Sequence, residues 1–349
     1  MARGVARWAR ELGVSEDATA LVATSDVLDL HLDTFIWRRV FGYDPRRRHG
    51  FGLFGRRYFG QVDFPRARES GLDGGTWVIT TNPFKPSRWR RDAFFANLDA
   101  LQGLLAEGGF RHVRTAAEYR AARAAGAPAA FLGVQGGNAL DHDLRDLERL
   151  PPLALLRVTL VHLTASRLGQ TSAPGGRLLR RGDGLTGRGR ELVERMNAGK
   201  IVVDLAHASP RTFWDAVRTN DRTIPFWVTH TGVSGVYPHW RNVDDDQLRA
   251  VADAGGVVGI MYQESFLGRR DVTSATVFAH LAHVVKVAGE DVAALGSDWD
   301  GAITPPRDLR TPGELPNLVQ RMLDAGWSDT RIRKVLGGNV LRSLEAVRG

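Results

Sequence analysis

The stretch KIVVDLAHASPRTFWDAVRTNDRTIPFWVTHTG, residues 200–232, contains the pattern that decides the fold. It begins with a short β-branched apolar run (200–209), which is typical of a buried strand. A charged amphipathic segment follows (209–220) and opens with Ser, a common helix N-cap. A second apolar run then ends in THTG (224–232). The stretch therefore predicts one strand–helix–strand unit of a parallel α/β sheet.

The same alternation extends along the chain in both directions. Eight apolar runs end in small or polar residues, at 27–33, 74–81, 129–137, 155–163, 200–209, 224–232, 255–262 and 292–301. Helix candidates lie between them, at 91–109, 186–200, 209–220, 244–256 and 273–290. Eight strands alternating with helices predict a TIM-type (β/α)8 barrel. We expect one domain over 1–349, with an N-terminal helical extension (1–25) and extra C-terminal helices (312–349) packed on the barrel.

Composition limits the chemistry that the chain can perform. With 349 residues, of which 43% are hydrophobic, the chain can bury a large core. It contains no Cys, which excludes disulfides, thiolate zinc sites and a cysteine nucleophile, so any metal must be held by His, Asp, Glu or an amide. The first twenty residues have charges spaced through them, and no run has the length of a membrane span. We therefore expect a cytoplasmic protein without a membrane partner.

The net charge of +8 raises the question of an acidic partner. Arginines cluster at 44–50, 87–92 and 176–190, but only four of the 47 basic residues are Lys, which indicates a general preference for Arg. The clusters fall in Gly- and Pro-rich segments and are not interleaved with an aromatic platform. We therefore expect no nucleic-acid binding.

Polar side chains stand at the ends of most predicted strands. In a barrel these ends meet at the active site, and here they provide His31, Asp33, Gln135, His162, His207, His230, Tyr262 and Asp298. A single His at a strand end is usually structural, but four at one level favour a metal site. The H-x-D pair of His31 and Asp33 places both side chains on one face of a strand, because the side-chain period is two.

These motifs and their order resemble the renal (membrane) dipeptidase family of the metal-dependent amidohydrolase superfamily. The resemblance covers nearly the whole chain. Its motifs are DLHLD (29–33), QVDFPRARESGLDGGTW (61–77), GVQGGNAL (133–140), VTLVH (158–162), DLAHAS (204–209), THTG (229–232), RNVDDDQL (241–248) and GSDWDG (296–301).

The resemblance implies a role for each matched residue. His31 and Asp33 would bind one zinc ion, and His207 and His230 a second. Asp298 would be the catalytic acid and base, and His162 would polarise the scissile carbonyl. Arg241 would anchor a substrate carboxylate, a role that suits a guanidinium, although on sequence alone it could equally be a surface arginine. Tyr262 and Asn138 would contact substrate, a dipeptide-like small molecule, and the chain could form a homodimer.

Gln135 departs from the family pattern. The family has a glutamate here whose two oxygens bridge both metals, whereas an amide offers one good donor oxygen and no negative charge. Two zinc ions bring four positive charges, and Asp33, Asp298 and a hydroxide offset three. The missing carboxylate leaves one charge uncompensated, at a distance where like-charged ions repel strongly. Further departures are Asn138 at a turn where many relatives have histidine, and a segment after His162 without the usual Asn-rich pattern.

Three interpretations are open. One metal could be held by His31, Asp33, His207 and Asp298; two could bind weakly with Gln135 terminal on one; or the chain could be a non-hydrolytic member, as a pseudoenzyme or a peptide-tailoring protein. The other expected ligands are all present, and this favours a metal-dependent dipeptidase-like hydrolase. Ligation by nitrogen and oxygen fits zinc best and also admits manganese, iron or cobalt. The insert at 42–61 could form a wall of the substrate pocket or an ordered connection.

Overall fold

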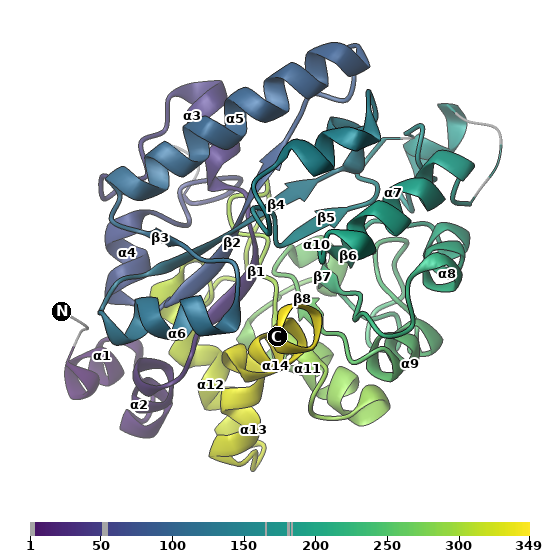
Figure 1. Cartoon of the computed structure of the whole chain (residues 1–349). Helices are drawn as coiled ribbons and strands as arrows, with labels where there is room; N and C mark the ends of the chain where they lie inside the picture. Colours follow the sequence, from purple (N-terminus) through teal and green to yellow (C-terminus); the bar gives the residue numbers. More distant parts are fainter. Residues whose placement is uncertain (1–3, 51–54, 165, 180–181, 183) are drawn as a thin grey trace.

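Eight parallel strands form a nearly closed barrel in the computed structural model of the chain (Figure 1). The structure describes residues 4–50, 55–164, 166–179, 182 and 184–349. The barrel strands are β1 (Leu28–Leu32), β2 (Gly74–Thr80), β4 (Ala129–Gln135), β5 (Arg157–Thr159), β6 (Val202–Asp204), β7 (Val228–Thr231), β8 (Val258–Ile260) and β9 (Ala293–Leu295). They correspond to the eight predicted runs, so the predicted TIM-type barrel is confirmed. A two-residue strand, β3 (Arg111–His112), pairs with β4 and was not predicted.

Neighbouring strands follow chain order around the ring. The pairing runs β6–β5–β4–β2–β1–β9–β8–β7, which leaves β6 and β7 to close the circle. Closure comes from a parallel bridge between Asp204 and Trp227, where Trp227 donates its backbone N–H to Val203 and Leu205 donates to Trp227. Since β6 and β7 stand opposite β1 in this order, side chains at their ends face those of β1 across the barrel.

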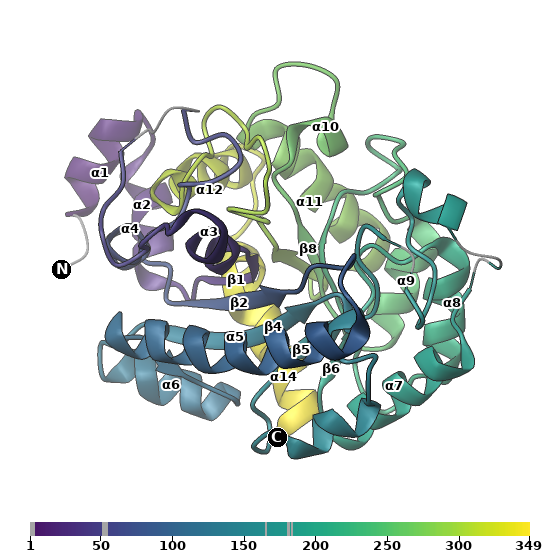
Figure 2. The same ribbon diagram turned by 90° about the horizontal axis from the view of Figure 1, so that it is seen from above.

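Helices surround the strands and pack on a large apolar core (Figure 2). In chain order they are α1 (Val5–Leu12), α2 (Glu16–Thr24), α3 (Thr34–Phe41), α4 (Phe64–Glu69), α5 (Ser87–Glu107), α6 (Ala116–Ala124), α7 (Gly187–Ala198), α8 (Pro210–Thr219), α9 (Asp245–Asp253), α10 (Glu264–Leu267), α11 (Ser274–Ala288), α12 (Leu315–Asp324), α13 (Asp329–Arg333) and α14 (Asn339–Arg348). Capping side chains fix where several helices begin. The Ser209 hydroxyl accepts from the backbone N–H of Thr212 at the start of α8, and Asp244 and Gln247 form a capping box at the start of α9.

The C-terminal helices cover the end of the barrel where the strands begin. Arg348 of α14 donates to the carbonyls of Lys200 and Leu155, which precede β6 and β5, and Ser343 accepts from the indole of Trp227. Helix α12 packs against α2, so the N-terminal helices and α12 lie beside each other (Figure 1). The opposite, carboxyl end of the strands remains for the functional side chains.

Candidate metal centre

The side chains predicted from the strand ends meet at the carboxyl end of the barrel. His31 lies in β1, and Asp33 follows it at the N-cap position of α3. Gln135 is the last residue of β4, and His230 lies in β7. The Nε2 of His31 lies 3.4 Å from Oδ2 of Asp33, as the H-x-D spacing predicts.

Two of these residues adopt backbone conformations that L-residues rarely take. His207, after β6, has φ of 65°, and Asp298, after β9, has φ of 61°. Left-handed conformations at non-glycine residues cost free energy and are found most often at functional sites. Both turns direct a side chain inward at the level where the strands end.

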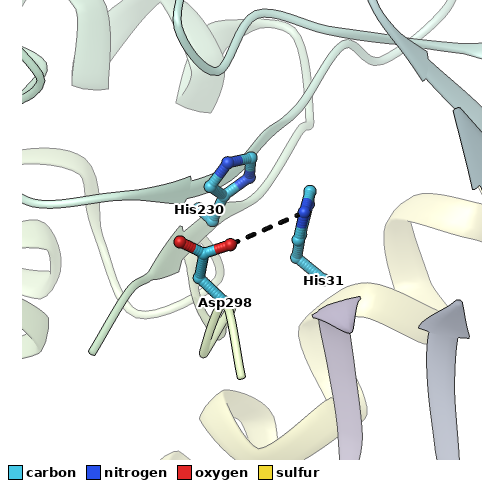
Figure 3. A group of neighbouring side chains, drawn as sticks. All are labelled: His31, His230 and Asp298. Carbon is cyan, nitrogen blue, oxygen red and sulfur yellow. Dashed lines mark ion pairs between the residues drawn. The ribbon is translucent and has the colours of Figure 1, made fainter. Parts of the chain in front are cut away.

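Three imidazoles and one carboxylate form the centre of the cluster. The Nε2 atoms of His207 and His230 are 2.9 Å apart, and the rings of His31 and His230 have centroids 3.8 Å apart. The ligand atoms of His31, His230 and Asp298 all lie within 4.8 Å of one another, and these side chains face one another in Figure 3. Three donors at this spacing suit a divalent transition metal.

Burial controls the charge of these groups. It lowers the pKa of His31, His207 and His230 well below 6.5 and that of His162 to about 4, so all four rings are neutral at pH 7. Burial and the nearby charge of Asp33 raise the pKa of Asp298 well above its ordinary value. Burial also raises the pKa of Asp33 to about 6, although His162 and Arg157 oppose the shift. A neutral imidazole is the protonation state that metal ligation needs.

One buried ring nitrogen of the cluster has no hydrogen-bond partner among the described residues, which bears on whether a metal fits here. Nδ1 of His207 is buried without a hydrogen-bond partner among the described residues, while its Nε2 points at another imidazole nitrogen. Two adjacent imidazoles that present their Nε2 atoms to each other can share one proton in a hydrogen bond or hold a cation between them. The donor set therefore fits a divalent metal ion.

A cavity of about 380 Å³ opens above the cluster. Its polar wall contains Asp33, Gln135, His162, His207, Arg241 and Asp298, and its apolar wall contains Ile36, Trp37, Leu163, Met261, Phe266 and Ile303. A small cavity with apolar walls and a few convergent polar groups is typical of a site for a small molecule.

Arg241 is part of this site. The guanidinium is buried, with 3% of the residue exposed, and Nη2 donates to the carbonyl of His230 at 2.6 Å. Burial lowers its pKa to about 10, so it remains charged at pH 7. The alternative of a surface arginine is therefore wrong.

Other predicted residues lie outside the cavity wall. Tyr262 is fully buried in a T-shaped contact with Trp299, and its hydroxyl has no partner among the described residues. Asn138 is partly buried in the turn that follows Gln135, where Gly136 has φ of 93°. Within the described part of the 42–61 insert, which omits 51–54, Phe59 stacks on Trp37 but no residue lines the cavity.

Sequence reasoning missed Arg157, which lies inside the barrel in β5 with 0% of its surface exposed. Its guanidinium reaches Nδ1 of His31 at 2.7 Å and Oδ2 of Asp204 at 3.1 Å. A charged residue inside the apolar run 155–163 was the available signal, because a buried charge needs a partner. Asp204, inside the apolar run 200–209, gave the same signal, whereas Thr229, which supports the same network, gave none.

Two comparisons with known proteins match most of the chain. The family model described as "Membrane dipeptidase (Peptidase family M19)" matches residues 15–349. A Klebsiella pneumoniae protein described as an uncharacterized protein in the pqqA 5′ region is 33% identical over 266 residues, which cover 73% of this chain and 96% of that protein.

Two solved structures have the same fold over most of the chain. The dipeptidase AC, a metallopeptidase of family M19, is 28% identical with a TM-score of 0.79, and the match covers 92% of this chain and 98% of that one. A metallopeptidase from Rhodobacter sphaeroides, liganded with a phosphinate mimic of the dipeptide L-Ala-D-Ala, is 27% identical with a TM-score of 0.78 and coverages of 93% and 99%.

Proposed function

The chain belongs to the membrane dipeptidase family, peptidase family M19, and from this membership we propose that it is a metal-dependent hydrolase cleaving the amide bond of a dipeptide or a similar small amide. The observation that supports this most is the meeting of His31, His230 and Asp298 beneath a cavity of about 380 Å³, with Nε2 of His207 2.9 Å from Nε2 of His230. The volume suits a ligand of dipeptide size.

A divalent ion bound there, which we propose is zinc, would supply Lewis-acid activation of water and of the substrate carbonyl. Asp298 would accept the proton from the water and return it to the leaving amine. Burial and the charge of Asp33 raise its pKa, which makes it a stronger proton acceptor than an exposed aspartate. His162, on the cavity wall, would polarise the substrate carbonyl by turning its N–H from the amide oxygen of Gln135, 3.2 Å from its Nε2, to the carbonyl.

Arg241 is the candidate anchor for the substrate carboxylate. It lies on the cavity wall, and its Nε has no hydrogen-bond partner among the described residues. A buried guanidinium with a free N–H can form a charge-assisted bond with a carboxylate. This arrangement favours substrates with a free C-terminus.

The proposal is tested with metal-loaded full-length protein and a panel of dipeptides that includes L-Ala-D-Ala, with released amino acids measured by mass spectrometry. We expect release that chelation abolishes and that Asp298→Asn lowers by at least about 100-fold. Arg241→Met should remove the preference for a dipeptide over its C-terminal amide. Dipeptide binding without release would instead favour a non-hydrolytic member of the family.

The oligomeric state and the compartment remain predictions. In the described parts of the chain, no helix has both the length and the apolar character needed to cross a membrane. A homodimer is the state we propose, and light scattering of the purified protein measures it.

A further inference from the structure

The metal centre has two halves, one containing His207 and His230 and the other containing His31 and Asp33. The imidazoles of His230 and His31 have opposite hydrogen-bond patterns. On one side, Oγ1 of Thr229 lies 2.7 Å from Oδ2 of Asp204 and 3.0 Å from Nδ1 of His230. Because the carboxylate can only accept, the single hydroxyl proton goes to Asp204, and the hydroxyl oxygen must accept from His230. His230 therefore carries its proton on Nδ1, and its Nε2 presents a lone pair to a metal.

The other side has the reverse arrangement. Nη2 of Arg157 lies 2.7 Å from Nδ1 of His31, and a guanidinium can only donate. Nδ1 of His31 is therefore the acceptor, and a neutral imidazole must then carry its proton on Nε2. That N–H points at Oδ2 of Asp33, 3.4 Å away. A nitrogen that carries a proton has no lone pair to give to a metal.

Gln135 forms hydrogen bonds with the other polar side chains around His31 and Asp33. Its amide satisfies its neighbours when the nitrogen faces Asp33, donating to Oδ2 at 3.0 Å and to Oδ1 at 3.2 Å. The amide oxygen then accepts from Nε2 of His162 at 3.2 Å and from Nε2 of His31 at 3.3 Å. The amide thus links Asp33, His162 and His31 by hydrogen bonds. A cation bound in this half would otherwise hold these side chains together.

We propose that this chain holds one divalent ion at His207 and His230, with Asp298 as the adjacent carboxylate, and that Arg157 and Gln135 close the His31–Asp33 half to metal. By distance, His31, His230 and Asp298 form the tightest group, because their ligand atoms all lie within 4.8 Å of one another, whereas His207 joins the site through its Nε2, 2.9 Å from Nε2 of His230. The proton on Nε2 of His31 excludes that nitrogen as a ligand. Arg157 is thus a positioning residue that sets the metal count, and the inference rests on the proposed metallohydrolase function.

The test compares two matched substitutions in the full-length protein. Metal-free wild type, His31→Asn and His230→Asn are loaded with Zn²⁺ or Co²⁺, dialysed and measured by elemental analysis. We expect about one ion per chain in wild type, an affinity within about threefold in His31→Asn, and a loss of about 100-fold or more in His230→Asn. Two ions in wild type, none at all, or an equal loss in both variants would overturn the proposal.

A second measurement needs no variant, so it decides even if a substitution prevents folding. Nitrogen-15 shifts of the histidine rings in the metal-free protein distinguish the two tautomers, and we expect the proton of His31 on Nε2 and that of His230 on Nδ1. A His31 ring protonated on Nδ1 would refute the proposal. Both readouts are independent of hydrolysis: one ion without dipeptide cleavage would support this inference and refute the proposed function.

Discussion

At the scale of single residues, the site is controlled by where protons lie on two imidazoles. Arg157 can only donate, and its contact with His31 makes that ring a hydrogen-bond donor toward the cavity. Thr229 does the opposite for His230. Residues that do not touch substrate therefore decide which side chains can be ligands, as is common in metal sites.

We predict that Gln135→Glu alone leaves the metal content near one ion per chain, because Arg157 still donates to His31. Combining it with Arg157→Lys should bring the content near two. Lysine keeps a cation for Asp204 but lacks the planar fork that also reaches His31. Elemental analysis measures both variants, and Arg157→Lys alone is the control. A second ion in the single Gln135→Glu variant would contradict the role assigned to Arg157.

At the scale of elements, the closure of the barrel supports the same site. Strands β6 and β7 meet through the bridge between Asp204 and Trp227, and the Asp204 carboxylate also accepts from the backbone and hydroxyl of Thr229 in β7. The contact that closes the ring therefore also orients His230. Barrel closure and ligand geometry depend on the same carboxylate.

We predict that Thr229→Val lowers the free energy of unfolding by about 1–3 kcal/mol, because it leaves buried polar groups unpaired. It should also weaken metal binding by about 10- to 100-fold, because His230 loses its partner.

Thr231→Val is the matched control on the same strand, since its hydroxyl bonds the carbonyls of Gly232 and Arg241 and not His230. Denaturant unfolding and metal titration measure both variants. Equal effects on metal binding would show that Thr229 has no specific role.

At the scale of the whole molecule, the architecture could be predicted from sequence and the tautomers could not. Strand periodicity and helix caps are local patterns, so eight runs predicted the eight barrel strands. Strand β3 was missed because two residues carry no detectable period. Arg157 and His31 are 126 positions apart, and their contact exists only because β5 and β1 face the same barrel interior.

Another buried histidine predicts how stability depends on pH. Nδ1 of His280 accepts from the backbone N–H of Val233 and its Nε2 donates to the carbonyl of Leu267, while burial lowers its pKa to about 4. The folded pKa lies below the unfolded value of 6.5, so this stabilisation is complete above pH 6.5 and is lost as pH falls toward 4. The loss is about 2–3 kcal/mol by pH 4.5.

We expect His280→Asn to be less stable than wild type at pH 7.5 and the difference to shrink at pH 4.5, as measured by urea unfolding. Asp29 and Asp300, whose pKa values burial raises to about 6, act in the opposite direction. Their contributions to the free energy of unfolding are the same in wild type and in His280→Asn, so they cancel in the difference between the two proteins. A difference that is constant with pH would mean that His280 does not titrate as proposed.

The most direct test of the account is a titration of metal-free protein with Zn²⁺, in which the rate of dipeptide cleavage is followed at each added equivalent. The account predicts that the rate rises in proportion to added metal and stops rising at one equivalent per chain. A rise that continues to two equivalents would contradict the single-ion site, and no cleavage at any ratio would contradict the hydrolase.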